Sequence, residues 1–280
     1  MNLIIYFLMS MSYTVTASKE HITLLFVGDI SFSGPVKYYV EHKYHTYNDS
    51  FNDVAPYIRE ADISVGNLET PFVDKDVYRQ MHMYTRKKNV LLDANTTAAP
   101  ALSFAGFDAV TLANNHLNDF GSEGANFSVE EPLILEKHGI KIGFLGYCDS
   151  LTMDKNCTEM RMMYDSGPAL YRDDVATRDV NKLKANVDII VVYMHYGQEC
   201  YLGPLPYQHR INKHLMSLGV QMIIGSHPHV IQPHCLHDNK LIAYSLGNFL
   251  FQPNRPPSGL DPKVYGRLGM KPNKLSIECL

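Results

Sequence analysis

The sequence predicts an α/β fold, and two observations lead to that prediction. Short apolar runs with the length of buried strands recur along the chain, and segments with helical spacing of apolar residues lie between them. Continuous runs rich in Val and Ile are typical of strands that are covered on both faces, as in a parallel sheet. The alternation of strand and helix therefore indicates that much of the sheet is parallel.

Each strand and helix is predicted from its own run of residues. The predicted strands cover residues 22–27, 63–65, 109–112, 140–145, 187–194, 220–224 and 241–244. Helices are predicted where apolar residues recur at a spacing of three or four, which places them on one helix face. These residues are Phe51, Val54 and Ile58 within 48–61; Val180, Leu183 and Val187; and Ile211, Leu215 and Leu218 after Pro206.

The composition is that of an ordinary globular protein, and it excludes one class of partner. Apolar residues make up 45% of the 280 residues and charged residues 19%, which suits one large domain with a full core. The net charge is −4 and no basic run is longer than Arg86-Lys87-Lys88, so no nucleic-acid partner is expected. A single domain over residues 18–280 is predicted, with an atypical, truncated tail from about residue 252, where prolines break every regular pattern.

The first 17 residues have features of a secretion signal. Their apolar stretch is shorter than the roughly 20 residues that span a bilayer, and it ends at the small-residue site Val15-Thr16-Ala17. No Lys or Arg precedes the stretch, and an uncleaved anchor or a loose N-terminal tail are the alternatives. We therefore expect a secreted, extracellular protein, or one held at a membrane if this segment stays uncleaved.

Sequons and cysteines agree with secretion without deciding it. Acceptor sequons begin at Asn48, Asn95, Asn126 and Asn156, and they predict a glycoprotein only in a eukaryotic host. An odd number of cysteines leaves at least one unpaired within the chain, no C-x-x-C pair suggests a thiolate zinc site, and the pairing stays open. The cysteines are Cys148, Cys157, Cys200, Cys235 and Cys279.

Polar residues follow six of the predicted strands, at the points where the strands end. In α/β sheets ligands bind at the carboxyl ends of strands, so side chains placed there by several strands converge on one cleft. Glycines beside them let the backbone turn and leave room for a ligand. The segments are Gly28-Asp29; Gly66-Asn67-Leu68-Glu69; Asn114-Asn115-His116; His195-Tyr196-Gly197; Gly225-Ser226-His227-Pro228-His229; and Ser245-Leu246-Gly247-Asn248.

The residue types in these segments fit a centre of one or two divalent metal ions. Carboxylates, a side-chain amide and imidazoles together suit Mn, Fe, Zn or Co. Two ions about 3.5–4 Å apart can bind the attacking and the leaving oxygen of a hydrolysis, and Glu69 could bridge them. His116 directly follows the proposed amide ligand Asn115. It is therefore placed to act as an acid or as an electrostatic partner.

Each of these residues also has a plainer interpretation. Asp29 could cap a helix, and Asn115 could belong to a simple turn. His227 and His229 flank a proline and could be surface-loop histidines. Because several strand ends carry such residues at one edge, the metal site is the favoured interpretation.

Further polar residues at the same edge are predicted to bind substrate. Glu199 lies four residues after His195, and a solvated loop charge is an equal alternative for it. The predicted substrate-binding residues are Asn67, Asn114, Glu199 and Asn248.

In their order along the chain, these segments resemble the CapA poly-γ-glutamate capsule-synthesis family. The resemblance covers roughly residues 22–251, and it is specific because no single motif carries it. That family is similar to the calcineurin-like metallophosphatases, which implies a four-layer sandwich with two mixed sheets packed face to face between helices. The resemblance also includes Asn118-Asp119-Phe120-Gly121, His195-Tyr196-Gly197-Gln198-Glu199 and Tyr244-Ser245-Leu246-Gly247-Asn248-Phe249.

The resemblance implies a role for each residue of the centre. Asp29 and His116 match residues expected to serve in catalysis. Two positions depart from the broader metallophosphatase pattern: Ser31 stands where a His is expected, and Glu69 stands where an Asp is expected. One of two metal subsites is therefore expected to be weak, and the subsite of Glu69, Asn115, His195 and His227 is favoured. The implied metal ligands are Asp29, Glu69, Asn115, His195, His227 and His229.

The sequence leaves three functions open. The first is a metal-dependent hydrolase of phosphoester or γ-glutamyl amide bonds in capsule polymer metabolism, with an anionic polymer or a small phosphoester as substrate. The second is a non-catalytic extracellular partner that binds, assembles or exports an anionic polymer through the same residues. The third is a degenerate relative whose site is intact by chance. Turnover separates the first function from the second.

Overall fold

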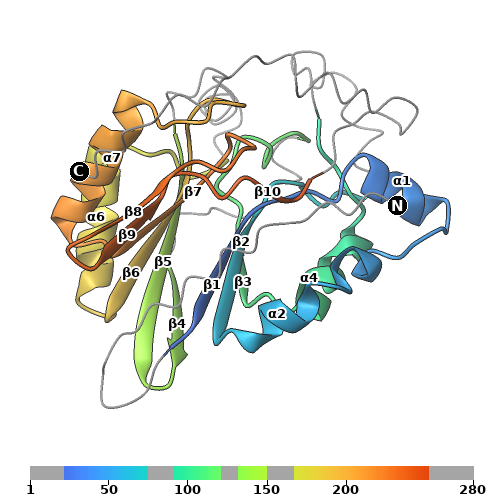
Figure 1. Ribbon diagram of the computed structural model, residues 1–280, viewed down its shortest axis with the longest axis horizontal. Helices are drawn as coiled ribbons and strands as arrows, with labels where there is room; N and C mark the ends of the chain where they lie inside the picture. The colour runs from blue at the N-terminus through green and yellow to red at the C-terminus, as the bar shows by residue number, and fades with distance from the viewer. Residues whose placement is uncertain (1–21, 75–90, 121–131, 150–166, 252–280) are drawn as a thin grey trace.

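The fold consists of two β-sheets that lie against each other, with helices on both outer sides (Figure 1). The computed structural model describes residues 22–74, 91–120, 132–149 and 167–251. The predicted signal segment 1–17, the tail from 252 and the sequons at Asn126 and Asn156 lie outside the described residues. In the part of the chain that is described, no helix has the length and apolar composition that a membrane span needs.

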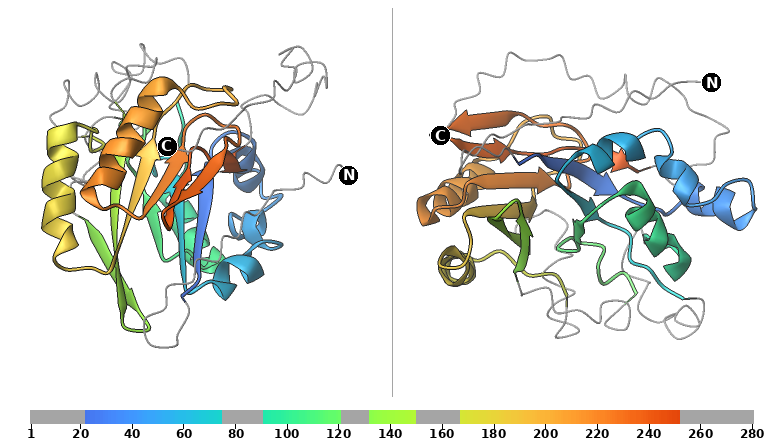
Figure 2. Two further views of the ribbon diagram at one scale, coloured as in Figure 1. Left: turned by 60° about the vertical axis from the view of Figure 1, so that its left-hand side comes forward. Right: turned by 90° about the horizontal axis from the view of Figure 1, so that it is seen from below.

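The first sheet has four strands in the order β10-β1-β2-β3, and all its pairings are parallel. Its outer face is covered by the helices that lie between β1 and β2 and between β2 and β3 along the chain. Figure 2 shows these helices, coloured blue to green, on one side of the molecule. The elements of this half are β1 (Leu24–Ile30), α1 (Pro35–Glu41), η1 (Asn48–Phe51), α2 (Ala55–Glu60), β2 (Ile63–Leu68), η3 (Thr96–Ala98), α4 (Ala99–Ala105), β3 (Ala109–Thr111) and β10 (Asn248–Leu250).

The second sheet has six strands in the order β4-β5-β6-β7-β9-β8, and it is mixed. Its central pairings are parallel, whereas the edge strands β4 and β8 pair antiparallel with their neighbours. Two long helices cover its outer face. The elements of this half are β4 (Leu133–Lys137), β5 (Ile140–Cys148), α6 (Asp173–Lys184), β6 (Ile189–His195), α7 (Pro206–Leu218), β7 (Met222–Ser226), β8 (His234–His237) and β9 (Lys240–Ala243).

The predicted α/β class, with two sheets between helices, is confirmed, and several details differ, among them the helices α1 and α4, which were not predicted. The four-stranded sheet is parallel rather than mixed. The predicted helix over 48–61 is divided into η1 and α2, because Pro56 occupies the first turn of α2 and has no N–H to continue a preceding helix. Strands β4, β8 and β10 were not predicted. In β4 the apolar run is only Leu133-Ile134-Leu135 before Glu136 and Lys137, and β8 has only two apolar residues between two histidines, so neither edge strand has a long apolar run.

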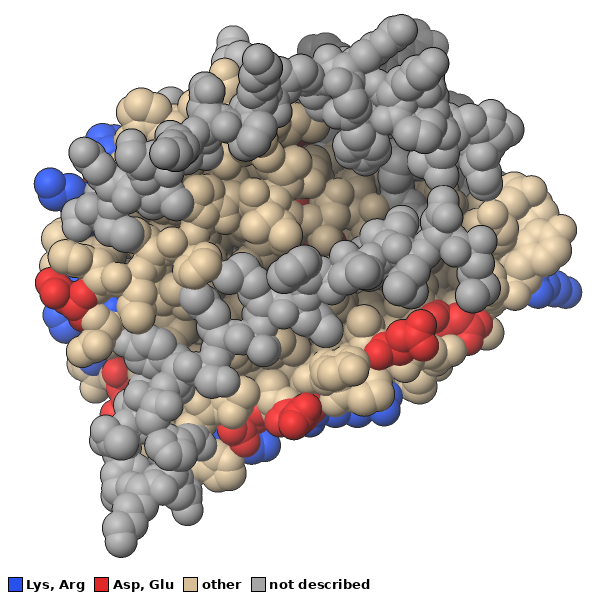
Figure 3. All heavy atoms as spheres, in the orientation of Figure 1, with Lys and Arg blue, Asp and Glu red and all other residues tan. Residues whose placement is uncertain are grey.

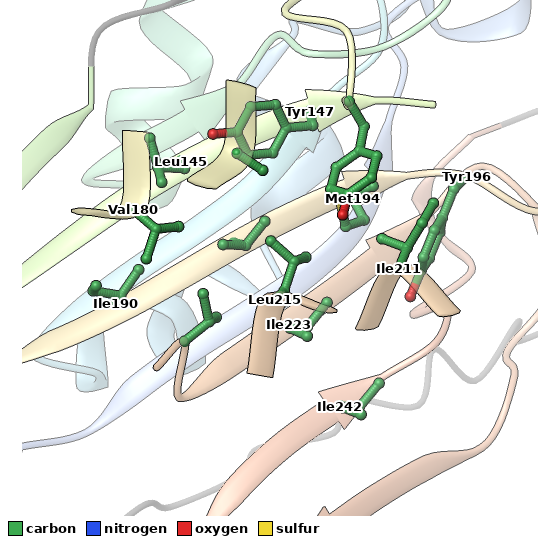
Figure 4. Close-up of a cluster of buried hydrophobic side chains, with 14 of the residues drawn as sticks. Leu145, Tyr147, Val180, Ile190, Met194, Tyr196, Ile211, Leu215, Ile223 and Ile242 are labelled. Atoms are coloured by element: carbon green, nitrogen blue, oxygen red, sulfur yellow. The ribbon is translucent and has the colours of Figure 1, made fainter. Parts of the chain in front are cut away.

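Three apolar clusters fill the spaces between the four layers. One lies between the six-stranded sheet and α6 and α7 (Figure 4). The second lies between the four-stranded sheet and its helices, and the third joins the two sheets. Strand β6 shows how one strand serves two clusters. Ile190, Val192 and Met194 face the helices, whereas Ile189, Val191 and Tyr193 face the other sheet.

The face between the sheets also leads to the polar edge. Alternation along β6 places His195 on the same face as Tyr193, which points toward the other sheet. Tyr193 is fully buried, and its hydroxyl donates to the carbonyl of Val65 at 2.8 Å. This bond ties β6 to β2, one strand from each sheet. The packing of the sheets therefore brings the strand ends of both halves together.

Candidate metal centre

A β-bulge in β1 turns Asp29 toward the space between the sheets. Phe26 pairs with Val65 and Asp29 pairs with Asn67, so β1 has one more residue than β2 over this stretch. Without the extra residue, alternation would place Asp29 on the helix-facing side. Gly28 lies in the bulge, and a Cβ there would meet the carbonyl oxygen of Gly247 at 1.8 Å. A glycine is therefore required where β1 and the residues before β10 touch.

Asp29 is held by donors from both sheets. Asn67 Nδ2 donates to Asp29 Oδ1 at 2.7 Å, and the backbone N–H of His227 donates to Oδ2 at 3.3 Å. Asn67 in turn accepts from Asn114 Nδ2 at 3.1 Å, and Asn114 Nδ2 also donates to the carbonyl of Leu68. Asn67 and Asn114, both predicted to bind substrate, are buried here and hydrogen-bond beside Asp29. Their role in substrate binding stays a prediction.

Glu69 follows β2 and lies at the middle of the centre. Its side chain is fully buried, and its backbone N–H donates to the carbonyl of Ile30. Glu69 Oε1 is 3.7 Å from His195 Nε2 and 3.9 Å from His116 Nε2. A buried carboxylate is costly unless cations or donors surround it, so this position suits a metal ligand.

The turn after β3 supplies an amide and an imidazole. Asn115 Oδ1 is 2.9 Å from His195 Nε2. His116 Nδ1 is 2.7 Å from Asp119 Oδ2, which also accepts from the backbone N–H of Leu92. Because the carboxylate accepts the bond, it fixes the His116 proton at Nδ1 and turns Nε2 toward Glu69. The sequence analysis assigned Asp119 no role of its own, and its spacing of three from His116 was the available signal.

The six-stranded sheet supplies the histidines of the centre. His195 ends β6, and its Nδ1 is 3.1 Å from the hydroxyl of Ser226, the last residue of β7. The rings of His195 and His227 lie 4.7 Å apart. Ser226 had no predicted role, and its place directly before His227 was the only signal for it. Gly225 beside it has no room for a side chain, because a Cβ would meet the carbonyl oxygen of Tyr244 at 2.0 Å.

His227 and His229 adopt backbone conformations that favour glycine. Their φ angles are +96° and +56°, in the left-handed region that costs side-chain-bearing residues of order 1–3 kcal/mol each. His227 is also almost completely buried, so it is not an ordinary surface-loop histidine.

His229 lies at the more open side of the centre. Its Nδ1 is 2.8 Å from Asn248 Oδ1 and 3.3 Å from Asp29 Oδ2, and 19% of its side chain is exposed. Burial alone would lower the pKa of His229, but the carboxylates of Glu69 and Asp29 raise it to about 10. Without a metal ion, His229 is therefore a cation at neutral pH. An ion with the same ligands would replace that proton.

The ligand atoms form two groups that share one carboxylate. Within each group the atoms lie within 4.8 Å of one another. We call them the inner group (Glu69, His195 and His227, all buried) and the outer group (Asp29, Glu69 and His229). Nitrogen and carboxylate donors in threes match the ligands that Zn, Mn and Fe take in proteins. The residues present therefore fit a divalent-metal centre, and Glu69 belongs to both groups.

Ser31 and Glu199 belong to neither ligand group. Ser31 is buried, and its hydroxyl accepts from Thr70 Oγ1 at 2.7 Å, so the place of the expected histidine is filled by a hydroxyl pair. Glu199 is exposed in the loop between β6 and α7, and no contact joins it to the centre in the described residues. The structure thus brings all the predicted metal ligands together and leaves Glu199 apart.

A hollow opens over this edge of the sheets. Figure 3 shows it in the upper middle of the face seen in Figure 1, with acidic atoms visible at its base. Asn248, the last predicted substrate-binding residue, is exposed and holds His229. The outer group is therefore the part of the centre nearest to solvent.

Comparison with known proteins finds two relatives among capsule biosynthesis proteins. The chain is 30% identical over 259 residues to the capsule biosynthesis protein CapA of Bacillus anthracis, covering 83% of this chain and 60% of that protein. It is 28% identical over 257 residues to the PGA biosynthesis protein CapA of Bacillus subtilis, covering 84% of this chain and 65% of that protein. The chain therefore spans less than two thirds of either relative.

One solved structure aligns with the chain, and one family model matches most of it. The NAD nucleotidase of Haemophilus influenzae aligns with a TM-score of 0.37 at 14% identity, covering 71% of this chain and 39% of that chain. The family described as bacterial capsule synthesis protein PGA_cap matches residues 23–131 and 126–253, which is most of the sequence. The chain belongs to the PGA_cap family of bacterial capsule synthesis proteins.

Proposed function

We propose that this protein binds one or two divalent ions, Mn, Fe or Zn, and hydrolyses a phosphoester or a γ-glutamyl amide bond in capsule polymer metabolism. The proposed substrate class is an anionic polymer or a small phosphoester, and membership of the capsule synthesis family supports it. The observation that carries the proposal is the pair of ligand groups sharing Glu69. Such ions would supply Lewis-acid stabilisation of the negative charge that develops during hydrolysis.

The chain's own residues would donate a proton and hold the metal ligands in position. His116 is held at Nδ1 by Asp119 and presents Nε2 to the centre. In its doubly protonated, imidazolium form it would donate the Nε2 proton to the leaving oxygen or nitrogen and keep the Nδ1 proton on its bond to Asp119. Asp29 would keep His229 and the backbone of His227 in place while it binds the outer ion. The buried amides of Asn67 and Asn114 fix the orientation of Asp29, as supporting residues of metal sites do.

The site of action that we propose is outside the cell or at its surface. Cys148 and Cys235 are both disulfide-bonded, and stable disulfides form in oxidising compartments. Cys200 is free and exposed. The disulfides support secretion, with a membrane anchor at residues 1–17 as the alternative. Mass spectrometry of the N-terminus of the protein from its host would distinguish a cleaved from an uncleaved segment.

Metal content is the first test of the proposal. Elemental mass spectrometry of the purified protein should find about two equivalents, and His227→Ala should lose the inner one. His237→Ala, which removes an exposed histidine of β8, is the matched control and should keep the wild-type content. If neither wild type nor control takes up metal after incubation with Mn, Fe and Zn, the proposal is wrong.

Turnover decides between an enzyme and a polymer-binding partner that uses the same site. This second candidate is favoured by Ser31, because the missing histidine leaves the outer group with fewer donors. Assays would use a chromogenic phosphoester and a γ-glutamyl oligomer, with His116→Ala as the variant. An enzyme should lose hydrolysis in His116→Ala while keeping its metal. A protein that binds the oligomer without releasing product would instead be the binding partner.

A further inference from the structure

A buried Tyr–Asp pair lies behind the inner group, at the end of the six-stranded sheet. Tyr207 belongs to the first turn of α7, and Asp149 directly follows β5. Asp149 is 1% exposed and carries no role in the site described above. Burial raises the pKa of the Tyr207 hydroxyl, and Asp149 raises it further, so the hydroxyl stays protonated and donates to the Asp149 carboxylate.

The pair holds the backbone on both sides of His195. The hydroxyl of Tyr207 accepts from the N–H of Gly197 at 2.8 Å. The N–H of Asp149 donates to the carbonyl of His195 at 3.0 Å. The turn that begins at His195 is thus fixed at its first carbonyl and at the amide two residues later. These contacts come from β5 and α7, which are far apart in the sequence.

The same turn touches the loop that carries the other histidines. Gly197 has a φ of +104°, and a Cβ there would lie 3.0 Å from Pro228 Cγ, between His227 and His229. The N–H of Cys200 donates to the carbonyl of Pro228 at 2.8 Å. A shift of residues 195–197 would therefore move His195. It would also move Pro228 and so change the position of the neighbouring His227. Both are inner-group ligands, whereas Asp29 is attached to the other sheet.

We propose that Asp149 and Tyr207 are positioning residues that set the geometry of His195 through the backbone of residues 195–197. The inference deepens the proposed function, because the geometry matters most for the affinity of the inner ion. Residues that orient metal ligands without touching the metal commonly change affinity by roughly 10–100-fold when they are replaced. A hydroxyl that binds Gly197 and Asp149 at once is the group on which this arrangement depends.

The chain offers a matched control, a second buried Tyr–Asp pair on the same side of the sheet. The hydroxyl of Tyr147 donates to Asp179 Oδ2 of α6 at 3.0 Å. Burial raises the pKa of Tyr147 as well, and Asp179 adds to the effect. This pair joins β5 to a helix, and in the described part of the chain no side-chain hydrogen bond links the Tyr147 hydroxyl or Asp179 to residues 195–197. Tyr147→Phe therefore removes the same group in the same kind of surroundings.

The experiment compares Tyr207→Phe with Tyr147→Phe in the full chain by two measurements. In the metal-free protein, NMR should show shifted His195 ring and Gly197 amide signals in Tyr207→Phe only. In a Co²⁺ titration followed by absorption, Tyr207→Phe should weaken the tighter equivalent by about tenfold and change the weaker one less. Should Tyr207→Phe fail to fold, Asp149→Asn provides the same comparison.

The outcomes separate this inference from the proposed function. Unchanged signals and affinity in Tyr207→Phe would overturn the inference, as would equal losses in both variants, which would show a general effect on stability. If the wild-type protein binds no cobalt, the proposed function is wrong. The NMR comparison then still decides the positioning role, because it is made without metal.

Discussion

The two sheets contribute different chemistry to one centre. The four-stranded sheet and the turns at its end supply oxygen donors, among them Asp29, Glu69 and Asn115, whereas the six-stranded sheet supplies His195 and the loop with His227 and His229. Neither sheet carries a complete ligand group, since each group combines carboxylates of the first half with imidazoles of the second. The centre therefore depends on the packing between the sheets as much as on the ligands.

Removal of the shared carboxylate should have the largest effect on this arrangement. Glu69→Gln keeps the side-chain volume but takes the charge from both groups, so both ions should be lost together. His227→Ala and His229→Ala should each lose one ion, because each histidine belongs to one group. Elemental mass spectrometry with exposed Glu136→Gln as control would measure this. Retention of one full equivalent in Glu69→Gln would contradict a bridging role.

The packing of the sheets can be tested with two neighbouring residues of β7. Ile224 faces the other sheet, Ile223 faces the helices, and both are almost completely buried. Replacement of either by Ala should cost about 2–5 kcal/mol of unfolding free energy. Only Ile224→Ala should also weaken metal binding, because it loosens the contact between the oxygen-bearing and nitrogen-bearing halves. Denaturant unfolding beside a metal titration would measure both effects.

An equal loss of metal affinity in Ile223→Ala and Ile224→Ala would contradict a special role for the packing between the sheets. It would mean that the centre responds to general destabilisation and not to the interface between the sheets. The contrast is sharp because the two residues are adjacent, have the same side chain and lie on opposite faces of one strand.

Much of this arrangement could be predicted from the sequence, for a physical reason. A strand buried on both faces reads as a continuous apolar run, so β1, β2, β5, β6 and β7 could be located and the polar residues after them placed at one edge. The edge strands β4 and β8 could not be, because their apolar residues are few and are followed or interrupted by polar ones. Strand order and pairing direction depend on contacts between distant segments, which is why the parallel four-stranded sheet was predicted as mixed.

The residues around the ligands were harder to predict than the ligands themselves. Asn67 and Asn114 were predicted to bind substrate, yet they are buried and hydrogen-bonded to one another beside Asp29. Their type and position at a strand end suit either role, and no local spacing shows that Asn67 donates to Asp29 across two strands. Asp149 and Tyr207 meet from segments more than 50 residues apart, so no local spacing could have joined them.

The raised pKa of His229 should make metal binding to the two groups respond differently to pH. The pKa of His229 lies near 10 in the metal-free protein, above the ordinary value of 6.5. The outer ion must displace this proton, so its affinity should rise by about tenfold per pH unit between pH 7 and 9. The inner group does not contain His229, and its ion should lack this dependence on His229. Competition titrations at several pH values would show the contrast, and His229→Gln should remove it.

The same shift predicts how the stability of the metal-free protein changes with pH. Because the pKa of His229 is higher in the folded than in the unfolded chain, protonation stabilises the fold fully below about pH 6.5. That contribution is lost as the pH rises through about 10. Urea unfolding of metal-free wild type and His229→Gln should therefore converge toward high pH. A difference between them that grows with pH would contradict the assignment.

The smallest expected effect on metal affinity is that of Asn248, which lies where the two halves of the molecule meet. Asn248 of β10 accepts from His229 Nδ1 at 2.8 Å, so one residue of the four-stranded sheet holds a histidine supplied by the other half. Asn248→Ala removes a hydrogen bond worth about 0.5–1.5 kcal/mol, which corresponds to a loss of roughly 2–13-fold in outer-ion affinity. The inner ion should be unaffected, and Asn186→Ala at the end of α6 is the matched control. A loss confined to the inner ion would show that His229 belongs to the other group, and the division into inner and outer ligands would have to be redrawn.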